Sequence, residues 1–295
     1  MPLSDVRAMV EAAQVGGYAV GYFEAWNLES LQGAIDAAEE TRSPAIIGFS
    51  GGFLSRPERR AFERLSIYAA MGRAAAEEAS VPCGLIFNEC PRDDWVRRAI
   101  SAGFNLVMPV ATGAADEDYA SRVANLTAIA HEHGAAVEAE LGELPCGSGG
   151  TIGADGSATD PQLAARFVRE TNVDLLAVSV GNVHIMIHGE RELDLDLLKE
   201  IHRQVPAPLV LHGGTGIARD SLEEAIALGV VKVNYGTYLK QRCLAAIRNK
   251  LGEEQSDPHE LLGLGGEWDV LVAGRNAMRE AVLERIEWLG CCGRA

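Results

Sequence analysis

Short apolar runs alternate with amphipathic segments along nearly the whole chain. Eight runs rich in Val, Ile, Leu and Phe predict buried strands at residues 18–23, 45–49, 83–87, 106–109, 136–141, 175–180, 209–211 and 231–234. Between many of them apolar residues recur at helical spacing, which predicts helices at residues 28–40, 58–79, 119–133, 160–170, 193–204, 220–228 and 239–251. This α/β alternation predicts a parallel sheet, and eight such units favour closure into a (β/α)8 TIM barrel. A doubly wound open sheet is the alternative, but no G-x-G-x-x-G sequence follows the first strand.

Two segments depart from the alternation. Residues 142–160 are rich in Gly, Ser and Asp and are too long for an ordinary strand-to-helix connection, so they are either a lid over a site or an insertion. Residues 258–289 predict more helix after the eighth strand, packed on the barrel or on a neighbouring subunit. No linker or repeat is evident, so we expect a single domain over residues 1–295, with residues 257–295 as a C-terminal helical extension.

The charge of the chain narrows the class of partner. The 295 residues include 26 Lys and Arg against 42 Asp and Glu, a net charge of −16. An acidic surface repels a phosphate backbone, so we expect no nucleic-acid partner. No apolar run reaches the roughly 18–20 residues that cross a bilayer, and the N-terminal segment is charged where a signal peptide is apolar. The six cysteines lack C-x-x-C spacing, which indicates reduced thiols, and we expect a cytoplasmic enzyme without membrane partners.

Polar residues follow several of the predicted strands at their C-terminal ends, where barrel enzymes carry their chemistry. They are Glu24, Ser50, Asn88, Glu89, Glu138, Glu140, His184, His212 and Asn234. His184 and His212 each lie just past a buried strand at the same end of the barrel. Imidazole and carboxylate groups together are ligands for zinc and related ions, so this pattern predicts a divalent metal site. The alternative for each histidine is a solvated or hydrogen-bonded loop residue.

A glycine-rich turn follows the seventh predicted strand. The segment LVLHGGTGI presents Gly213, Gly214, Thr215 and Gly216 before the next helix, and their backbone N–H groups can bind a phosphate. The next strand ends in VKVNYGT, which adds Asn234 and Thr237. Loops after the seventh and eighth strands are the usual phosphate site of such barrels. The alternative is an ordinary tight turn.

These segments, together with GGYAVGYFEAWNLESLQGAIDAAEETRSPAII, VEAELGEL and AVSVGNVH, resemble the class II, metal-dependent fructose-bisphosphate and tagatose-bisphosphate aldolases. The resemblance covers nearly the whole chain and implies a barrel that forms a homodimer or homotetramer. It implies a zinc ion that polarises a ketose carbonyl and stabilises an enediolate. It makes His184 and His212 metal ligands and Glu140 a catalytic residue. Its phosphate- and ketose-binding loops correspond to Gly181, Gly213, Gly214, Thr215, Gly216, Asn234 and Thr237.

The chain also departs from the family pattern. Where the family has H-x-D-H after the third strand, this chain has Ile86, Phe87, Asn88 and Glu89. Asn88 stands at the catalytic Asp position and cannot exchange a proton as a carboxyl group does. Glu89 stands at a metal-ligand position, and a His184–His212–Glu89 set suits Zn²⁺ and also Mn²⁺, Co²⁺ or Fe²⁺.

The family's Asn after the first strand is Glu24 here, and we expect Glu24 to be the base that replaces the missing Asp. The alternative is a structural ion pair of Glu24 with Arg56 or Arg59. Two further departures are Ile185 and Gly236, which stand where the family has a Gly and a second Asn or Asp of the eighth strand.

The sequence therefore predicts a divergent class II aldolase-like lyase with Glu24, Asn88 and Glu140 as catalytic residues. Its substrate would be a ketose, phosphorylated in the first instance, or a related hydroxy-keto compound. One alternative is a non-catalytic paralogue that binds a sugar phosphate without cleaving it. The other is a metal-dependent isomerase on the same barrel. Metal content separates the paralogue from the enzymes, and release of an aldehyde separates the lyase from the isomerase.

Overall fold

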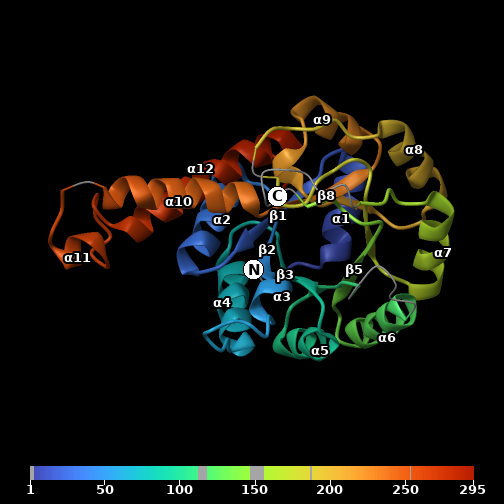
Figure 1. The fold of residues 1–295 in the computed structure, drawn as a ribbon, viewed down its shortest axis with the longest axis horizontal. Helices are drawn as coiled ribbons and strands as arrows, with labels where there is room; N and C mark the ends of the chain where they lie inside the picture. Colours follow the sequence, from blue (N-terminus) through green and yellow to red (C-terminus); the bar gives the residue numbers. More distant parts are fainter. Residues whose placement is uncertain (1–2, 112–117, 147–155, 187, 253) are drawn as a thin grey trace.

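A computed structural model describes residues 3–111, 118–146, 156–186, 188–252 and 254–295. Eight parallel strands close into one barrel in sequence order, as the alternation predicts (Figure 1). The strands are β1 (Val20–Ala25), β2 (Ala45–Ser50), β3 (Cys83–Cys90), β4 (Leu106–Pro109), β5 (Ala136–Leu141), β6 (Leu175–Val178), β7 (Leu209–Leu211) and β8 (Val230–Tyr235).

The helices mostly surround the barrel on its outside, but the first of them lies inside the ring of the others in this view (Figure 1). They are α1 (Val6–Gly16), α2 (Leu28–Thr41), α3 (Gly51–Leu54), α4 (Leu65–Glu78), α5 (Asp93–Ala102), α6 (Tyr119–Glu132), α7 (Pro161–Thr171), α8 (Leu195–Gln204), α9 (Arg219–Ala227), α10 (Thr237–Leu251), α11 (Pro258–Leu261) and α12 (Val270–Leu289), with a 3₁₀ turn η1 (Gly214–Gly216). Several begin at side-chain caps: Asn27 and Ser30 form a capping box at α2, and Asp160 precedes Pro161 at α7.

Several predicted elements begin at a different residue from the observed one, and two of these differences bear on the site. The first strand starts at Val20 rather than at residue 18, because Gly17 ends α1 in the left-handed region and the Tyr18 amide still donates to the Ala13 carbonyl. The helix predicted at 58–79 starts only at Leu65. Ser50 caps the short helix α3 directly after β2, so the chain turns at the barrel mouth before α4 begins. The first strand also ends at Ala25 rather than at residue 23, which places Glu24 inside β1.

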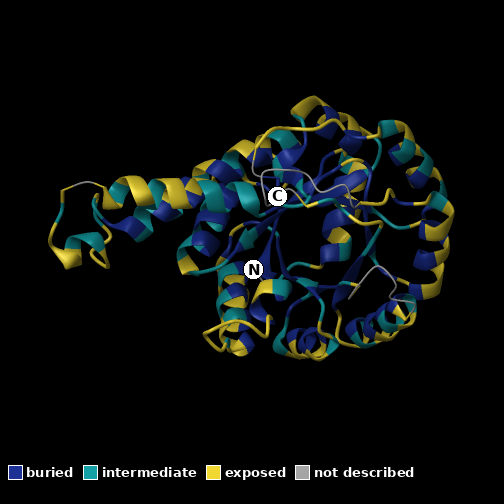
Figure 2. Ribbon diagram, in the orientation of Figure 1, coloured by how far each residue is buried: buried dark blue, intermediate teal, exposed yellow. Residues whose placement is uncertain are grey.

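The C-terminal helices form an arm on one side of the barrel. Helix α12 packs against α2, contacts α9 and β1, and runs beside α10. Figures 1 and 2 show α10, α11 and the first part of α12 extending away from the barrel, with exposed residues along much of their surface. In the described part of the chain, no helix is long and apolar enough to cross a membrane.

Alternate residues of each strand face the inside of the barrel, because successive side chains of a strand point to opposite sides. Near the C-terminal ends several of these inward residues are polar: Tyr22 and Glu24 on β1, Glu138 and Glu140 on β5, and Lys232 and Asn234 on β8. Apolar core residues surround them (Figure 2). The barrel therefore concentrates polar groups at one end of an apolar interior.

Candidate active site

A cavity of about 880 Å³ opens at the C-terminal ends of the strands. Most of the predicted site residues line it. They are Glu24, Ser50, Asn88, Glu89, Glu140, His184, Gly213, Thr215, Asn234 and Thr237, joined by Ile185 and Gly236. The predicted residues Gly181, Gly214 and Gly216 do not line the cavity, and neither do His212 and Glu138, which lie buried behind its wall. The barrel thus brings together side chains from strands that are far apart in sequence.

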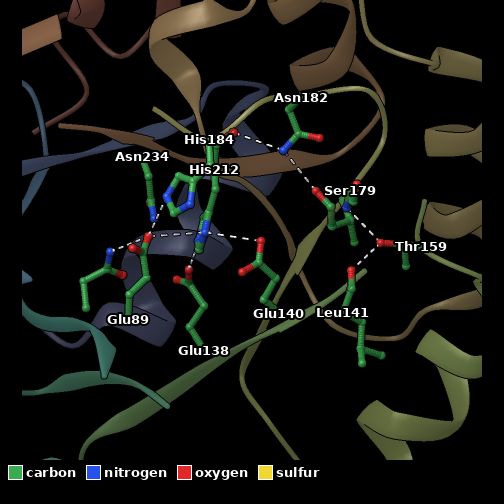
Figure 3. Close-up of polar contacts among 12 residues, drawn as sticks. Glu89, Glu138, Glu140, Leu141, Thr159, Ser179, Asn182, His184, His212 and Asn234 are labelled. Atoms are coloured by element: carbon green, nitrogen blue, oxygen red, sulfur yellow. Dashed lines mark hydrogen bonds and ion pairs between the residues drawn. The ribbon is translucent and has the colours of Figure 1, made fainter. Parts of the chain in front are cut away.

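His212 is completely buried and is held by a chain of polar contacts (Figure 3). Its Nε2 lies 2.8 Å from Glu138 Oε1, and the other oxygen of Glu138 lies 2.8 Å from Lys232 Nζ. Burial favours the neutral form of Glu138, but the charge of Lys232 and the contact with His212 outweigh it and lower the pKa of this carboxyl. An ionised Glu138 accepts a hydrogen bond from the Nε2–H of His212, which in the neutral imidazole leaves the lone pair on Nδ1. Burial disfavours the imidazolium form of His212, but the charge of Glu140 and the contact with Glu138 outweigh it and raise the His212 pKa.

The free nitrogen of His212 faces two carboxylates. His212 Nδ1 lies 3.5 Å from Glu89 Oε1 and 3.6 Å from Glu140 Oε1, and His184 Nε2 lies 3.4 Å from the same Glu89 oxygen. Neither His212 Nδ1 nor Glu140 Oε1 has a hydrogen-bond partner among the described residues, although both atoms are buried. Figure 3 shows the side chains of Glu89, Glu138 and Glu140 gathered around the two imidazoles.

The charges of neighbouring side chains determine the protonation states of His184, Glu89 and Glu140. Burial disfavours the imidazolium form of His184, but Glu89 beside it raises the His184 pKa to about 9. Burial likewise disfavours the Glu89 carboxylate, but His184 and then His212 lower its pKa to about 2. Burial raises the pKa of Glu140, and the two histidines only partly offset it. Glu89 is therefore the anionic centre of the group.

A β-bulge brings Glu89 into the cavity. The register between β3 and β4 shifts between Phe87 and Cys90, and Glu89 has a φ of 53°. Asn88 and Glu89 would face opposite sides of a regular strand, but the bulge turns both toward the cavity. Asn88 Nδ2 donates to Glu89 Oε1 over 3.0 Å, while Asn88 Oδ1 has no partner in the described structure. Glu89, whose backbone lies in the left-handed region, therefore organises the side chains of the site around it.

Whether these residues fit a divalent ion can be tested on their donor atoms. Within the described ranges, no group of three or more His, Cys, Asp or Glu side chains is placed so that it could hold a metal ion as it stands. Glu89 Oε1 nonetheless lies 3.4 Å from His184 Nε2 and 3.5 Å from His212 Nδ1. A tetrahedral site with bonds of about 2.0–2.2 Å has donor separations of about 3.3–3.6 Å. His212 Nδ1 is buried without a hydrogen-bond partner among the described residues, and the Glu138 carboxylate holds the other ring nitrogen, so the donor set of His184, His212 and Glu89 fits such an ion.

Glu24 forms an ion pair, but not with the predicted arginines. Its Oε1 lies 2.6 Å from Lys240 Nζ on α10. Arg59 instead pairs with Glu63, and the Arg56 guanidinium lies over the Phe53 ring, so the alternative of an ion pair with either arginine is wrong in its partner. The sequence could not show this, because the helix after β8 returns Lys240 to the mouth beside β1.

Burial raises the pKa of Glu24, and the charge of Lys240 lowers it only in part. The other oxygen of the carboxyl group depends on Gly236. A Cβ atom at position 236 would lie 2.3 Å from Glu24 Oε2, so any larger residue there would displace it. Glu24 and Gly236, two of the departures from the family pattern, are therefore sterically linked.

Backbone contacts fix the two histidine loops against each other. Asn182 Nδ2 donates to the His212 carbonyl over 3.0 Å (Figure 3). The Val180 amide donates to Asn182 Oδ1. A Cβ at Gly213 would lie 2.2 Å from the Val183 carbonyl oxygen, so glycine allows this close approach.

The predicted lid begins beside these loops. The His184 amide donates to the Pro145 carbonyl, which places the start of the segment at the site. An antiparallel bridge between Glu143 and Ser157 joins the two ends of the segment. Residues 147–155 of the predicted lid lie outside the described residues. Ile185, where the family has Gly, has a φ of 54° and lines the cavity.

Two inward-facing residues of the site were not found from the sequence. Lys232 is completely buried inside the barrel, and its position in the otherwise apolar VKVNY run was a usable signal, because a buried lysine requires a partner. Tyr22 is also buried and lines the cavity, but a tyrosine within a strand is too common to attract notice.

The fold and this cavity define a (β/α)8 barrel protein with an acidic and imidazole-rich site at the C-terminal ends of its strands. The family model described as "Fructose-bisphosphate aldolase class-II" matches residues 4–294. The chain belongs to the class II fructose-bisphosphate aldolase family, which confirms the resemblance in its sequence.

Individual relatives and solved structures agree with this family assignment. A "Probable fructose-bisphosphate aldolase" of Bacillus subtilis (strain 168) is 33% identical over 299 residues, covering 100% of both chains. A "Fructose-bisphosphate aldolase" of Staphylococcus aureus (strain N315) is 31% identical with the same coverage. The crystal structure of the YdjI aldolase from Escherichia coli K12 matches with a TM-score of 0.81 and 31% identity, covering 99% of each chain. The chain is therefore similar to aldolases along its whole length.

Proposed function

We propose that this protein is a metal-dependent lyase that cleaves a ketose by a retro-aldol reaction. The substrate class is a phosphorylated ketose or a related hydroxy-ketone. Membership of the class II aldolase family supports the reaction type. The observation that carries the proposal is the buried, unpartnered His212 Nδ1, which faces Glu89 and Glu140 beside His184.

His184, His212 and Glu89 would hold the ion, with Zn²⁺ as the first choice and Mn²⁺, Co²⁺ or Fe²⁺ as alternatives. When bound, such an ion acts as a Lewis acid on the carbonyl oxygen of the substrate. Glu138 and Lys232 would position His212, because their contacts hold its ring with Nδ1 toward the cavity.

The chain's own residues would move the protons. Retro-aldol cleavage needs a base that takes the hydroxyl proton of the aldehyde half as the carbon–carbon bond breaks. It also needs an acid that then protonates the freed carbon of the ketone half. Glu24 is the proposed base, because it lines the cavity, is half-buried there and has a raised pKa. Glu140, whose pKa burial also raises, is the proposed acid. Asn88 cannot carry a proton, but its free Oδ1 can accept a hydrogen bond from a substrate hydroxyl.

The far side of the cavity would bind the phosphate. Gly213, Thr215, Asn234 and Thr237 line it at the ends of β7 and β8, where barrel enzymes commonly bind phosphate. A role for Gly181, Gly214 and Gly216 stays a prediction. We also propose a homodimer or homotetramer, which is supported by the exposed side chains of Leu244, Leu251, Leu262 and Leu264 on the C-terminal arm.

Aldehyde release tests the proposal. We expect the purified protein, loaded with Zn²⁺, Mn²⁺ or Co²⁺, to release an aldehyde from at least one of fructose 1,6-bisphosphate, tagatose 1,6-bisphosphate and fructose 1-phosphate. The same preparation stripped with a chelator is the matched control and should be inactive. Conversion to an isomer without an aldehyde would instead establish an isomerase. A ligand-induced rise in melting temperature without turnover would establish a binding paralogue, and either result contradicts the lyase.

A further inference from the structure

Tyr22 places an unused hydroxyl group at the cavity. Its side chain is 2% exposed, it lines the cavity, and its hydroxyl oxygen has no hydrogen-bond partner among the described residues. In the strand register Tyr22 on β1 lies opposite Asn234 on β8. Two positions up the same strand is Glu24, on the same face. The phenol therefore lies among the groups proposed to bind and cleave the substrate.

The neighbouring amides show which polar groups the cavity offers. Lys232 Nζ lies 2.5 Å from Asn234 Oδ1, and because lysine only donates, the amide oxygen must face it. Asn234 Nδ2 is then turned away from Lys232, and it has no partner within the described chain. Asn88 has the opposite arrangement, with its nitrogen on Glu89 and its oxygen free. The cavity thus presents one amide donor and one amide acceptor, both unsatisfied by the protein.

The phenol adds a second donor. Burial first, and then the charges of Glu24, Glu89 and Glu138, raise the Tyr22 pKa well above its ordinary value, so the hydroxyl keeps its proton at physiological pH. Lys232 Nζ lies 5.3 Å from the centre of the ring and supports it from one side. A buried hydroxyl without a partner destabilises a folded protein, and such groups are retained where they have a function.

We propose that Tyr22 is a further catalytic residue, whose hydroxyl donates a hydrogen bond to a substrate oxygen beside Asn234 Nδ2, while Asn88 Oδ1 accepts one from a substrate hydroxyl. This inference rests on the proposed function. Tyr22, Asn234 and Asn88 together offer two donors and one acceptor without hydrogen-bond partners among the described residues. Such a set suits a compound with both carbonyl or alkoxide oxygens and free hydroxyls, which is the chemistry of a polyhydroxylated ketone. The phenol supplies a contact that Asn88, with its nitrogen held by Glu89, does not supply.

The variant Tyr22→Phe tests this, because it removes one oxygen atom and keeps the ring. With the ketose phosphate that the wild type cleaves fastest, we expect kcat/KM to fall about 10–100-fold. The melting temperature without substrate should stay equal or rise, because the unsatisfied hydroxyl is gone. The matched control is Tyr18→Phe, since Tyr18 is also buried but lies before β1 at the other end of the barrel and does not line the cavity. Its kcat/KM should stay at the wild-type value.

A loss smaller than tenfold in Tyr22→Phe would overturn the inference, and so would a fall in activity that accompanies a lower melting temperature. Failure of the proposed function gives a different result, because the wild type then releases no aldehyde from any of the three ketose phosphates. In that case the role of the Tyr22 hydroxyl is tested by comparing the affinities of the wild type and Tyr22→Phe for fructose 1,6-bisphosphate. Weaker binding by the variant supports the hydrogen bond, whereas equal binding or no binding refutes it.

Discussion

Replacing Glu24 by glutamine should lower turnover by about 10²–10⁴-fold while the protein stays folded. The amide has the size of the carboxyl group, so its oxygen can still accept the hydrogen bond from Lys240 beside Gly236. It cannot accept the hydroxyl proton that retro-aldol cleavage releases. The measurement is kcat at saturating ketose phosphate, together with the metal content of the same preparation. The control is Glu63→Gln, which removes a carboxylate that pairs with Arg59 near the protein surface and should keep full turnover.

The pH profile distinguishes a base from a structural ion pair. Burial raises the Glu24 pKa, so the carboxylate form that accepts a proton is lost as the pH falls through that raised value. As the pH falls, the kcat/KM of the wild type should therefore begin to decrease at a pH above the ordinary pKa of a glutamate. This acid limb of the pH profile should be absent in Glu24→Gln. Unchanged turnover and an unchanged profile in the variant would mean that Glu24 only pairs with Lys240.

Replacing Lys232 by methionine should destabilise the folded protein by about 3–5 kcal/mol. Lys232 and Glu138 are both completely buried, and their charged groups lie 2.8 Å apart. Removing the lysine leaves the Glu138 carboxylate inside the barrel without its cation, which is the costly case for a buried ion pair. Urea unfolding should show a lower midpoint with an unchanged slope.

A second substitution tests that explanation. In Lys232→Met with Glu138→Gln no charge is left unpaired, and the amide oxygen can still accept from His212 Nε2, so part of the lost stability should return. Breaking an exposed pair, Arg203→Met beside Glu200, should cost less than about 1 kcal/mol. If Lys232→Met also lowers the free energy of unfolding by less than about 1 kcal/mol, the buried pair does not stabilise the barrel as described.

Local patterns were enough to predict the barrel and much of its mouth. The alternation of strands and helices predicted the order of the elements, and strand ends mark the functional face of this fold. His184, Glu89 and Asn234 were therefore located without knowledge of any contact. These predictions needed only the position of a residue relative to its own strand.

The sequence could not show which residues of distant elements contact one another. The pairing of Glu24 with Lys240 depends on how α10 returns across the mouth, and the sequence suggested nearby arginines instead. The inward turn of Glu89 depends on a bulge that no local residue pattern marks. Lys232 was detectable as a charge in an apolar strand, but its partner Glu138 lies on β5 and is defined only by barrel closure. Tertiary geometry therefore determined the chemistry of residues whose location was predictable.

The metal content of the purified, untagged protein tests the central claim most directly. Elemental analysis of the wild type should find about one divalent ion per chain, and the variant His184→Ala with His212→Ala should contain none. The variant His133→Ala with His259→Ala removes two exposed histidines outside the cavity and should keep the ion. A wild type without an ion after reconstitution with Zn²⁺, Mn²⁺ and Co²⁺, or equal metal in the first variant, would contradict the assignment of His184 and His212 as ligands.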